Sequence, residues 1–190
     1  MASNVEIGNS ALHLLGEDSI NAFTDDSVPA KLMNAEFGNT RDALLREHPW
    51  KFAIKRVQLG QLATGPLYGF TYAYQLPGDC LRVLDADIDE DDKPWKIEGR
   101  TLTTDATAVK IRYLAQVTDP AQFDGSFMGC LAARLAMELA VPITNSLGLF
   151  DRMTDLYQRR LQDARNHNAI ETSLETYETP SPDLLKVREA

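Results

Sequence analysis

Residues 123–140 read FDGSFMGCLAARLAMELA, and this stretch decides the helical part of the fold. Large apolar side chains recur every four residues on one helical face, at Phe123, Phe127, Leu131, Leu135 and Leu139. Alanines cover much of the remaining surface, so the helix should be buried on most sides. We therefore predict a central helix over residues 120–140, which Pro142 ends.

Arg134 and Glu138 are the only charged residues near the centre of this apolar stretch. They allow two interpretations. They form a satisfied buried pair, which can fix the register between packed elements, or they reach a boundary between subunits.

Helical patterns also occur on both sides of the central helix. A capping box at Ser3 and Glu6 begins a helix over residues 3–15. Ser, Val and Pro in succession open a second helix over residues 28–48, with the proline in the first turn. The fourth helix is predicted over residues 143–168, and its apolar stripe should pack on the central helix.

Between residues 50 and 114 the apolar pattern changes from helical to alternating, which predicts short antiparallel strands. Apolar and charged side chains alternate along residues 109–113, so one face of this sheet should be buried and the other exposed to solvent. Residues 77–79, Pro-Gly-Asp, are typical of a turn, and they predict a hairpin between the strands on either side within an antiparallel meander.

The predicted fold class is therefore α+β, predominantly a bundle of four helices with a small antiparallel β region inserted between the second and third. Residues 1–170 should form a single domain. Residues 171–190 lack an apolar stripe and contain two prolines, so we predict an extended C-terminal tail that orders only on a partner.

Composition excludes several classes of protein. The 190 residues carry a net charge of −9 with a pI near 4.8, which disfavours tight binding to DNA phosphates. Cys80 and Cys130 lie far apart without a CxxC spacing, so neither a disulfide scaffold nor a zinc site is expected, and a reduced cytosolic origin fits. We find no signal-peptide pattern and expect no membrane span.

Motifs that carry chemistry are weak in this sequence. The run at residues 85–89, Asp-Ala-Asp-Ile-Asp, has the spacing that opens an EF-hand loop, but Glu90 and Lys96 stand where that loop needs Gly and Glu. We interpret the run as a solvated acidic loop between strands. The three histidines share no metal-binding spacing, and no nucleophile elbow or phosphate-binding glycine loop occurs. We therefore expect no catalytic, cofactor-binding or metal-ligating residues and no enzyme.

A structural corner is predicted where the second helix meets the β region. Pro49 ends the helix at His48, and His48 suits the helix end because a cation is favoured there. Trp50 and Phe52 should anchor the corner by packing.

Three segments together resemble a known family. They are residues 44–53, LLREHPWKFA, residues 72–83, YAYQLPGDCLRV, and residues 119–120, Asp-Pro, before the alanine-rich helix. They are similar to the head-to-tail adaptor of short-tailed bacteriophages, also called tail tubular protein A. The resemblance extends over roughly residues 5–168 and rests on packing motifs, so it indicates an architecture more than an activity.

The resemblance implies a structural protein of the virion, located at the neck and assembled in the host cytoplasm. It implies a ring of twelve copies beneath the portal protein, linked below to a tail nozzle or fibre protein, with double-stranded DNA passing through the lumen without specific binding. The candidate portal contacts lie near the C-terminus: Tyr177, Leu184, Leu185, Lys186, Val187 and Arg188. Two other functions stay open, a glycan-degrading tail-associated hydrolase that uses paired carboxylates, and a monomeric cytosolic scaffold.

Overall fold

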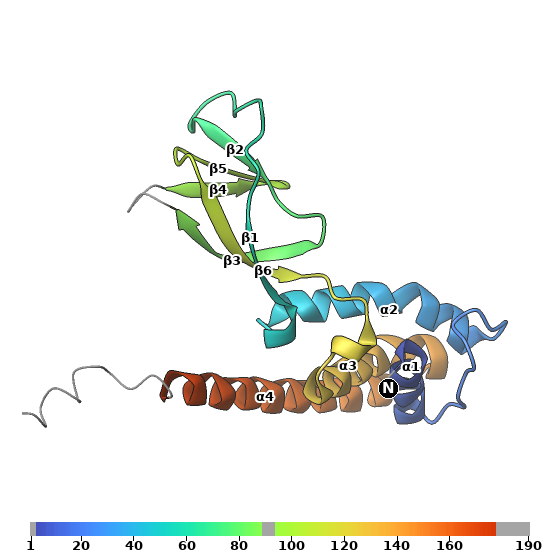
Figure 1. Cartoon of the computed structure of the whole chain (residues 1–190). Helices are drawn as coiled ribbons and strands as arrows, with labels where there is room; N and C mark the ends of the chain where they lie inside the picture. The colour runs from blue at the N-terminus through green and yellow to red at the C-terminus, as the bar shows by residue number, and fades with distance from the viewer. Residues whose placement is uncertain (1–2, 89–93, 178–190) are drawn as a thin grey trace, which may run out of the picture. The chain divides into compact units, whose positions relative to one another are not determined.

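The structure is a computed structural model that describes residues 3–88 and 94–177 (Figure 1). The sequence analysis treated residues 1–170 as one domain, and the structure divides them between two compact units. Among the described residues, the β unit comprises residues 37–88 and 94–123, and the helical unit comprises residues 3–36 and 124–177. The predicted α+β class, with four helices and a β region between the second and third, is confirmed.

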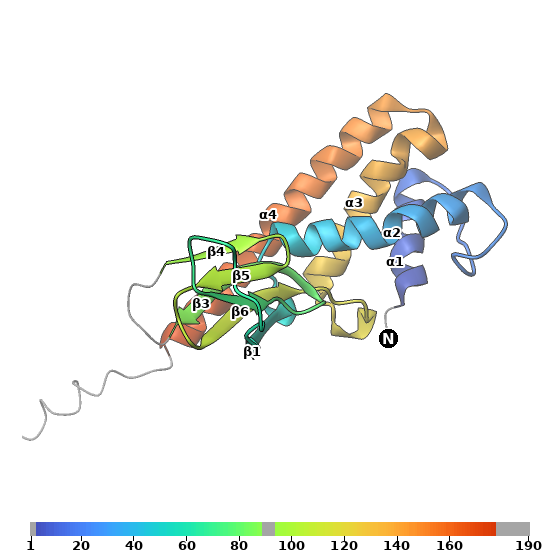
Figure 2. The same ribbon diagram turned by 90° about the horizontal axis from the view of Figure 1, so that it is seen from above.

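The helical unit is built around α3 (Gly125–Thr144), which packs against α1 (Asn4–Leu15) and α4 (Leu147–Tyr177). Figure 2 shows α3 and α4 running side by side. The predicted stripe forms the core, because Phe127, Leu131, Leu135 and Leu139 are all buried. By length and composition alone α3 could also cross a membrane, but its packing inside this unit accounts for its apolar character.

Helix α1 begins as its sequence predicts. The Ser3 hydroxyl accepts a hydrogen bond from the Glu6 N–H at 3.1 Å, and the Glu6 carboxylate accepts one from the Ser3 N–H at 2.7 Å. This reciprocal pair satisfies two backbone donors that the first helical turn leaves without partners. Gly16 ends the helix in the left-handed conformation, with φ of 80°.

The predicted limits of the central helix are wrong at both ends. Residues Pro120–Gln122 form a separate 3-10 turn, and α3 starts only after Asp124, whose carboxylate accepts from the Phe127 N–H at 2.6 Å. Pro142 lies inside α3 and does not end it. The proline is in the last turn, where few backbone bonds follow, and the helix closes at Asn145, whose N–H donates to the Val141 carbonyl at 2.9 Å.

The fourth helix starts four residues later than predicted, at Leu147, because α3 extends to Thr144, and it is longer than predicted. It continues to Tyr177, so residues 171–177, which we assigned to an extended tail, are helical. Residues 149–179 contain no proline or glycine, and extending an existing helix costs far less than starting one, so α4 continues although residues 171–177 lack an apolar stripe. Residues 178–190 lie outside the described part of the chain.

The β unit holds two three-stranded antiparallel sheets (Figure 1). The first has the order β1-β6-β3, with β1 (Ile54–Gln58), β6 (Val109–Ala115) and β3 (Cys80–Ile88). The second has the order β2-β5-β4, with β2 (Tyr72–Gln75), β5 (Thr101–Thr104) and β4 (Trp95–Glu98). A short 3-10 helix, η1 (Lys51–Ala53), and the C-terminal part of α2 (Val28–Glu47) precede the strands.

The predicted hairpin around residues 77–79 is wrong, as is the single meander. β2 and β3 do not pair with each other but belong to different sheets. Pro77 has no N–H to offer a ladder, and after it the chain crosses from the second sheet to the first. The two sheets share one core that includes Tyr74 and Leu102 from the second sheet and Ile111 and Tyr113 from the first.

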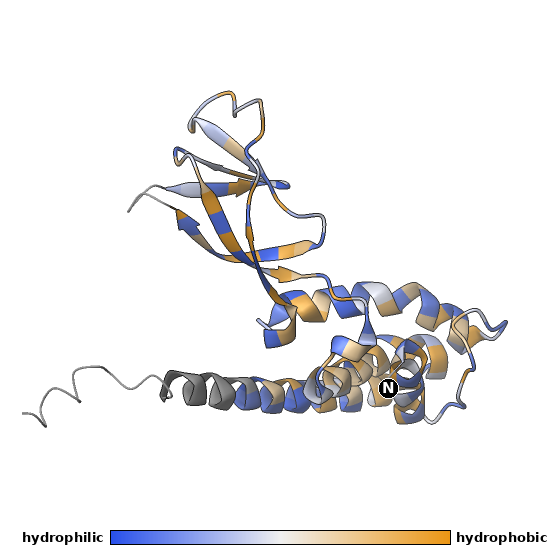
Figure 3. Cartoon of the chain, in the orientation of Figure 1, coloured by the Kyte–Doolittle hydropathy of each residue, from blue (hydrophilic) through white to orange (hydrophobic). Residues whose placement is uncertain are grey.

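The alternation along residues 109–113 is confirmed. Val109, Ile111 and Tyr113 are buried, and Lys110 and Arg112 are exposed. Figure 3 shows apolar and polar residues alternating along the strands of this unit. One face of the first sheet therefore covers the core, and the other carries charge.

Candidate functional site

The residues of the predicted corner lie together at the end of α2. Trp50 is only 1% exposed, and its indole N–H donates to the Leu44 carbonyl in the last turn of α2 at 3.0 Å. The His48 ring stands edge-on to the indole, with 5.0 Å between ring centroids. Phe52 lies 6.3 Å from Trp50 and 5.8 Å from Phe123, centroid to centroid. This cluster joins the last turn of α2 to η1 within the β unit.

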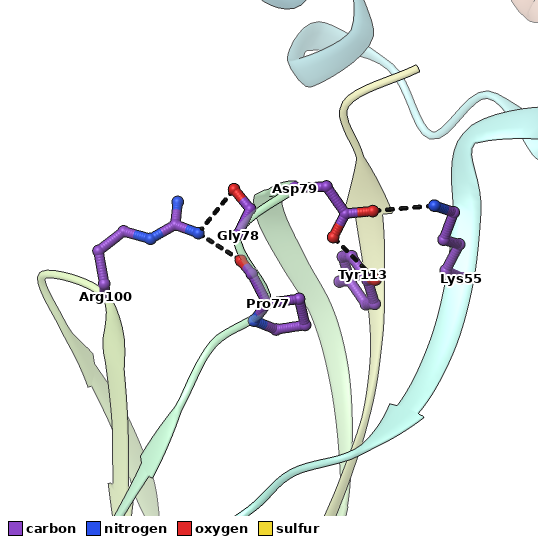
Figure 4. Close-up of polar contacts among 6 residues, drawn as sticks. All are labelled: Lys55, Pro77, Gly78, Asp79, Arg100 and Tyr113. Atoms are coloured by element: carbon purple, nitrogen blue, oxygen red, sulfur yellow. Dashed lines mark hydrogen bonds and ion pairs between the residues drawn. The ribbon is translucent and has the colours of Figure 1, made fainter. Parts of the chain in front are cut away.

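A denser polar cluster surrounds the connection between the two sheets, and Figure 4 shows it. The Arg100 guanidinium donates to three backbone carbonyls of this connection: those of Pro77, of Gly78 at 3.1 Å and of Cys80 at 3.0 Å. The Arg100 carbonyl in turn accepts from the Leu76 N–H at 3.0 Å. We call residues 77–80, with the side chains that hold them, the sheet joint.

Arg100 can reach these carbonyls because of the turn that carries it. Glu98 pairs with Thr101, so only Gly99 and Arg100 connect β4 to β5. Gly99 has φ of 61°, a conformation that residues with a Cβ adopt only at a cost, and a glycine with positive φ at the first position is typical of a tight two-residue hairpin loop.

Asp79 is the charged centre of the sheet joint. One carboxylate oxygen accepts from the Lys55 ammonium at 2.8 Å, and the other accepts from the Tyr113 hydroxyl at 3.1 Å (Figure 4). The hydrogen bond from Lys55 is the main reason that the pKa of Asp79 lies below its ordinary value. Burial and then the hydrogen bond to Asp79 raise the pKa of Tyr113 to about 12.

The sheet joint is therefore poorly suited to acid–base chemistry near neutral pH. Asp79 stays ionised there and Tyr113 stays protonated, whereas a general acid or base works best with a pKa close to the working pH. The neighbouring Cys80 thiol is buried, and that burial raises its pKa, which keeps it away from the reactive thiolate form. The arrangement binds two sheets together and offers no nucleophile.

The acidic run at residues 85–89 is not a loop as far as the structure describes it. Asp85 and Asp87 lie on β3, opposite Arg112 and Lys110 of β6, with carboxylate-to-cation distances of 3.8 and 3.7 Å. Our interpretation as a loop between strands is wrong for this part, and Asp89 falls outside the described residues. Cross-strand ion pairs thus use the two carboxylates. Within residues 3–88 and 94–177, no group of three or more His, Cys, Asp or Glu could hold a metal ion.

Arg134 turns towards α4. Its guanidinium lies 3.3 Å from the Tyr157 hydroxyl and 5.6 Å from the centre of the Tyr157 ring. Glu138 is exposed, so the two residues do not form a buried pair. Contact of either residue with a subunit boundary stays a prediction.

Of the candidate portal contacts, only Tyr177 lies in the described part of the chain, as the last residue of α4. The other five, Leu184, Leu185, Lys186, Val187 and Arg188, lie outside it.

Sequence reasoning missed the most exposed apolar residues. Leu67 and Tyr68 are 101% and 89% exposed on the β unit, and Val28 and Leu147 are exposed on the helical unit. The signal for the first pair was present, because Gly65-Pro66 and Gly69 enclose an apolar dipeptide with turn residues. Large exposed apolar groups indicate surfaces that bind other macromolecules when they occur together.

No protein-family model matches the chain, and the comparison with curated proteins found no similar sequence. Any function must therefore be argued from the geometry and from the three segments quoted above.

Proposed function

We propose that this protein is a structural subunit of a virion, the head-to-tail adaptor of a short-tailed bacteriophage. In this proposal, copies form a ring beneath the portal protein, with twelve as the expected number. The ring links the portal to the tail nozzle or fibre protein and surrounds the channel through which the DNA leaves.

The resemblance of residues 44–53, 72–83 and 119–120 to that family is the starting point. These segments correspond to joints of the fold: Trp50 lies in the corner after α2, and Asp79 lies in the sheet joint. A ring subunit that bears mechanical load needs residues that keep its scaffold rigid.

The observation that carries the proposal is the distribution of exposed apolar side chains. The β unit presents Leu67 and Tyr68, and the helical unit presents Val28 and Leu147. An adaptor needs at least two separate binding surfaces, one for each neighbour in the assembly, and large exposed apolar side chains occur on both units of this chain. The polar groups of the sheet joint, by contrast, serve internal contacts.

Net charge also supports this role. A basic lumen would hold DNA by its phosphates, whereas a subunit with a net charge of −9 lets the duplex slide past. Binding to DNA should accordingly be weak and without sequence preference.

The test is the mass of the purified chain under native conditions, followed by electron-microscope images of the chain mixed with a portal ring. We expect closed rings seated on one end of the portal. A chain that remains monomeric at high concentration and never decorates portal rings refutes the proposal and favours the monomeric scaffold. Glycan hydrolysis that copurifies with the protein and is lost on changing one carboxylate favours the hydrolase instead.

A further inference from the structure

The connection between β1 and β2 presents Leu67 and Tyr68 at the tip of a firmly held loop. At its base the Leu62 N–H donates to the Ala73 carbonyl at 2.8 Å. The N–H and hydroxyl of Thr71 both donate to one carboxylate oxygen of Asp105, at 2.8 and 2.7 Å. We call residues 65–69 the apolar tip.

The loop is also closed tightly across its neck. A Cβ added at Gly65 would lie 2.6 Å from the Thr71 carbonyl oxygen, which is closer than real contacts allow. Gly69 has φ of 89°, so it too adopts a conformation that favours glycine. Hydrogen bonds and two glycines that cannot readily be replaced thus hold a leucine and a tyrosine exposed to water, where apolar surface is unfavourable.

The helical unit has a groove of complementary character, with a volume of about 310 Å³, between α1, α3 and α4. Its apolar lining residues are Ile7, Met128, Gly129 and Ala132, and its polar ones are Glu6, Ser10 and Arg160. A Cβ added at Gly129 would meet no atom within 4 Å, so the missing side chain leaves this part of the groove open.

Among the polar groups of the groove, Arg160 suits a tyrosine. The Arg160 guanidinium donates to the Gly129 carbonyl at 2.8 Å, which uses one of the five N–H donors of that group. The remaining donors can meet a phenol oxygen, and the guanidinium plane can lie against an aromatic ring. An occupant with one aliphatic and one phenolic side chain therefore matches both parts of the groove.

We propose that the apolar tip of one copy inserts Leu67 and Tyr68 into the groove between α1, α3 and α4 of a second copy. This inference rests on the proposed function, because it names the contact that joins neighbouring ring subunits. The tip and the groove are different surfaces of one chain, so the contact is heterologous, and heterologous contacts generate rings when their rotation closes. A buried tyrosine and leucine form an anchor within a larger interface, since a stable interface needs about 800 Å² from each partner.

Disulfide trapping between two different variants tests the contact directly. One variant carries Tyr68→Cys and the other Gly129→Cys, each with a different tag, and the buried Cys80 and Cys130 are left in place. After mixing and mild oxidation, we expect a disulfide between the two tagged chains. The matched control replaces Tyr68→Cys by Val28→Cys, which is also exposed but lies outside the tip. A yield no greater than that of this control overturns the inference.

Two further variants test whether the contact drives association. Leu67→Ser combined with Tyr68→Ser removes the anchor, and self-association should weaken about thirtyfold if the pair is a hot spot worth roughly 2 kcal/mol. Gly129→Leu should fill the groove and weaken association similarly. Its thermal midpoint should be unchanged or raised, because leucine is a better helix former than glycine. Normal association of both folded variants overturns the inference.

The outcomes separate this inference from the proposed function. Closed rings on the portal without the disulfide between positions 68 and 129 refute the contact and leave the adaptor intact. The disulfide without rings or portal binding supports the contact and refutes the adaptor.

Discussion

Replacing Trp50 by alanine should destabilise the β unit more than any other single change at the corner after α2. The side chain is 1% exposed, and its N–H donates to the Leu44 carbonyl at 3.0 Å. Truncation removes the packing against the His48 and Phe52 rings and leaves a cavity, because a close-packed interior relaxes only in part. Such a Trp→Ala change costs about 3–5 kcal/mol, and the lost hydrogen bond is included in that range.

A second substitution separates the contribution of the Trp50 hydrogen bond from that of its packing. Trp50→Phe keeps an aromatic ring but removes the indole N–H, so the Leu44 carbonyl loses this donor. A hydrogen bond of this kind contributes about 0.5–1.5 kcal/mol, and the smaller ring adds some loss of packing. The free energy of unfolding should therefore fall less for Trp50→Phe than for Trp50→Ala.

Urea denaturation followed by circular dichroism measures these free energies. The matched control is Trp95→Ala, which also removes an indole but from a half-buried position on β4, and it should cost less than Trp50→Ala. A Trp50→Ala variant within about 1 kcal/mol of the parent chain refutes the reasoning. If such a variant folds normally but fails to assemble, Trp50 is an interface anchor instead.

Four other predictions concern the sheet joint and the C-terminus. The pKa of Asp79 is lowered by folding, so the contacts of its carboxylate stabilise the fold fully above about pH 4, and this stabilisation is lost as the pH drops through the lowered pKa. Asp79→Asn should lower the free energy of unfolding by about 0.5–1 kcal/mol at pH 7 and should make that free energy depend less on pH in the acid range. An unchanged pH dependence in the acid range contradicts this prediction. The pKa of Tyr113 is raised to about 12, so the protonated phenol stabilises the fold fully below about pH 10, and this contribution is lost towards pH 12. Tyr113→Phe should remove the most alkaline step from an ultraviolet titration of the tyrosines. Arg100→Ala should lower the free energy of unfolding measured in denaturant by about 1–3 kcal/mol, because it removes three hydrogen bonds to backbone carbonyls. The control Lys96→Ala on β4 should lower it by under about 0.5 kcal/mol. Equal losses for the two variants would show that the three carbonyl contacts contribute little to stability. Removing the residues after Tyr177 should leave the thermal midpoint nearly unchanged and abolish portal attachment in a pull-down, and normal docking of the shortened chain places the attachment elsewhere.

The sequence predicted the helices well because their signals are local. The four-residue repeat of α3 and the capping box at Ser3 act within one or two turns, so they can be found without knowing the rest of the fold. Helix ends were predicted less well. Pro142 lies in the last turn of α3, and α4 continues past its apolar stripe, because a helix that already exists extends at little cost until a breaker occurs.

The sheets were predicted only in part, since strand pairing depends on residues distant in sequence. Alternation gave the buried and exposed faces of β6, but nothing local shows that β3 pairs with β6 and not with β2. The sheet joint was missed for the same reason. Asp79 meets Lys55 and Tyr113 across separations of 24 and 34 residues, and no spacing rule connects them.

The two kinds of cluster on the β unit respond differently to their surroundings, and this difference fits the assembly role proposed above. In the sheet joint, Asp79 stays ionised and Tyr113 stays protonated throughout the neutral range, so the charge of the joint does not change with pH there. The apolar tip contains no acidic or basic residue, and covering it with another surface lowers its free energy because Leu67 and Tyr68 are exposed. Whether another surface covers the tip depends on the concentration of the protein and on the partners present, and both change while a virus particle is assembled. We therefore infer that assembly acts through the tip while the joint keeps the tip's supporting sheets in place.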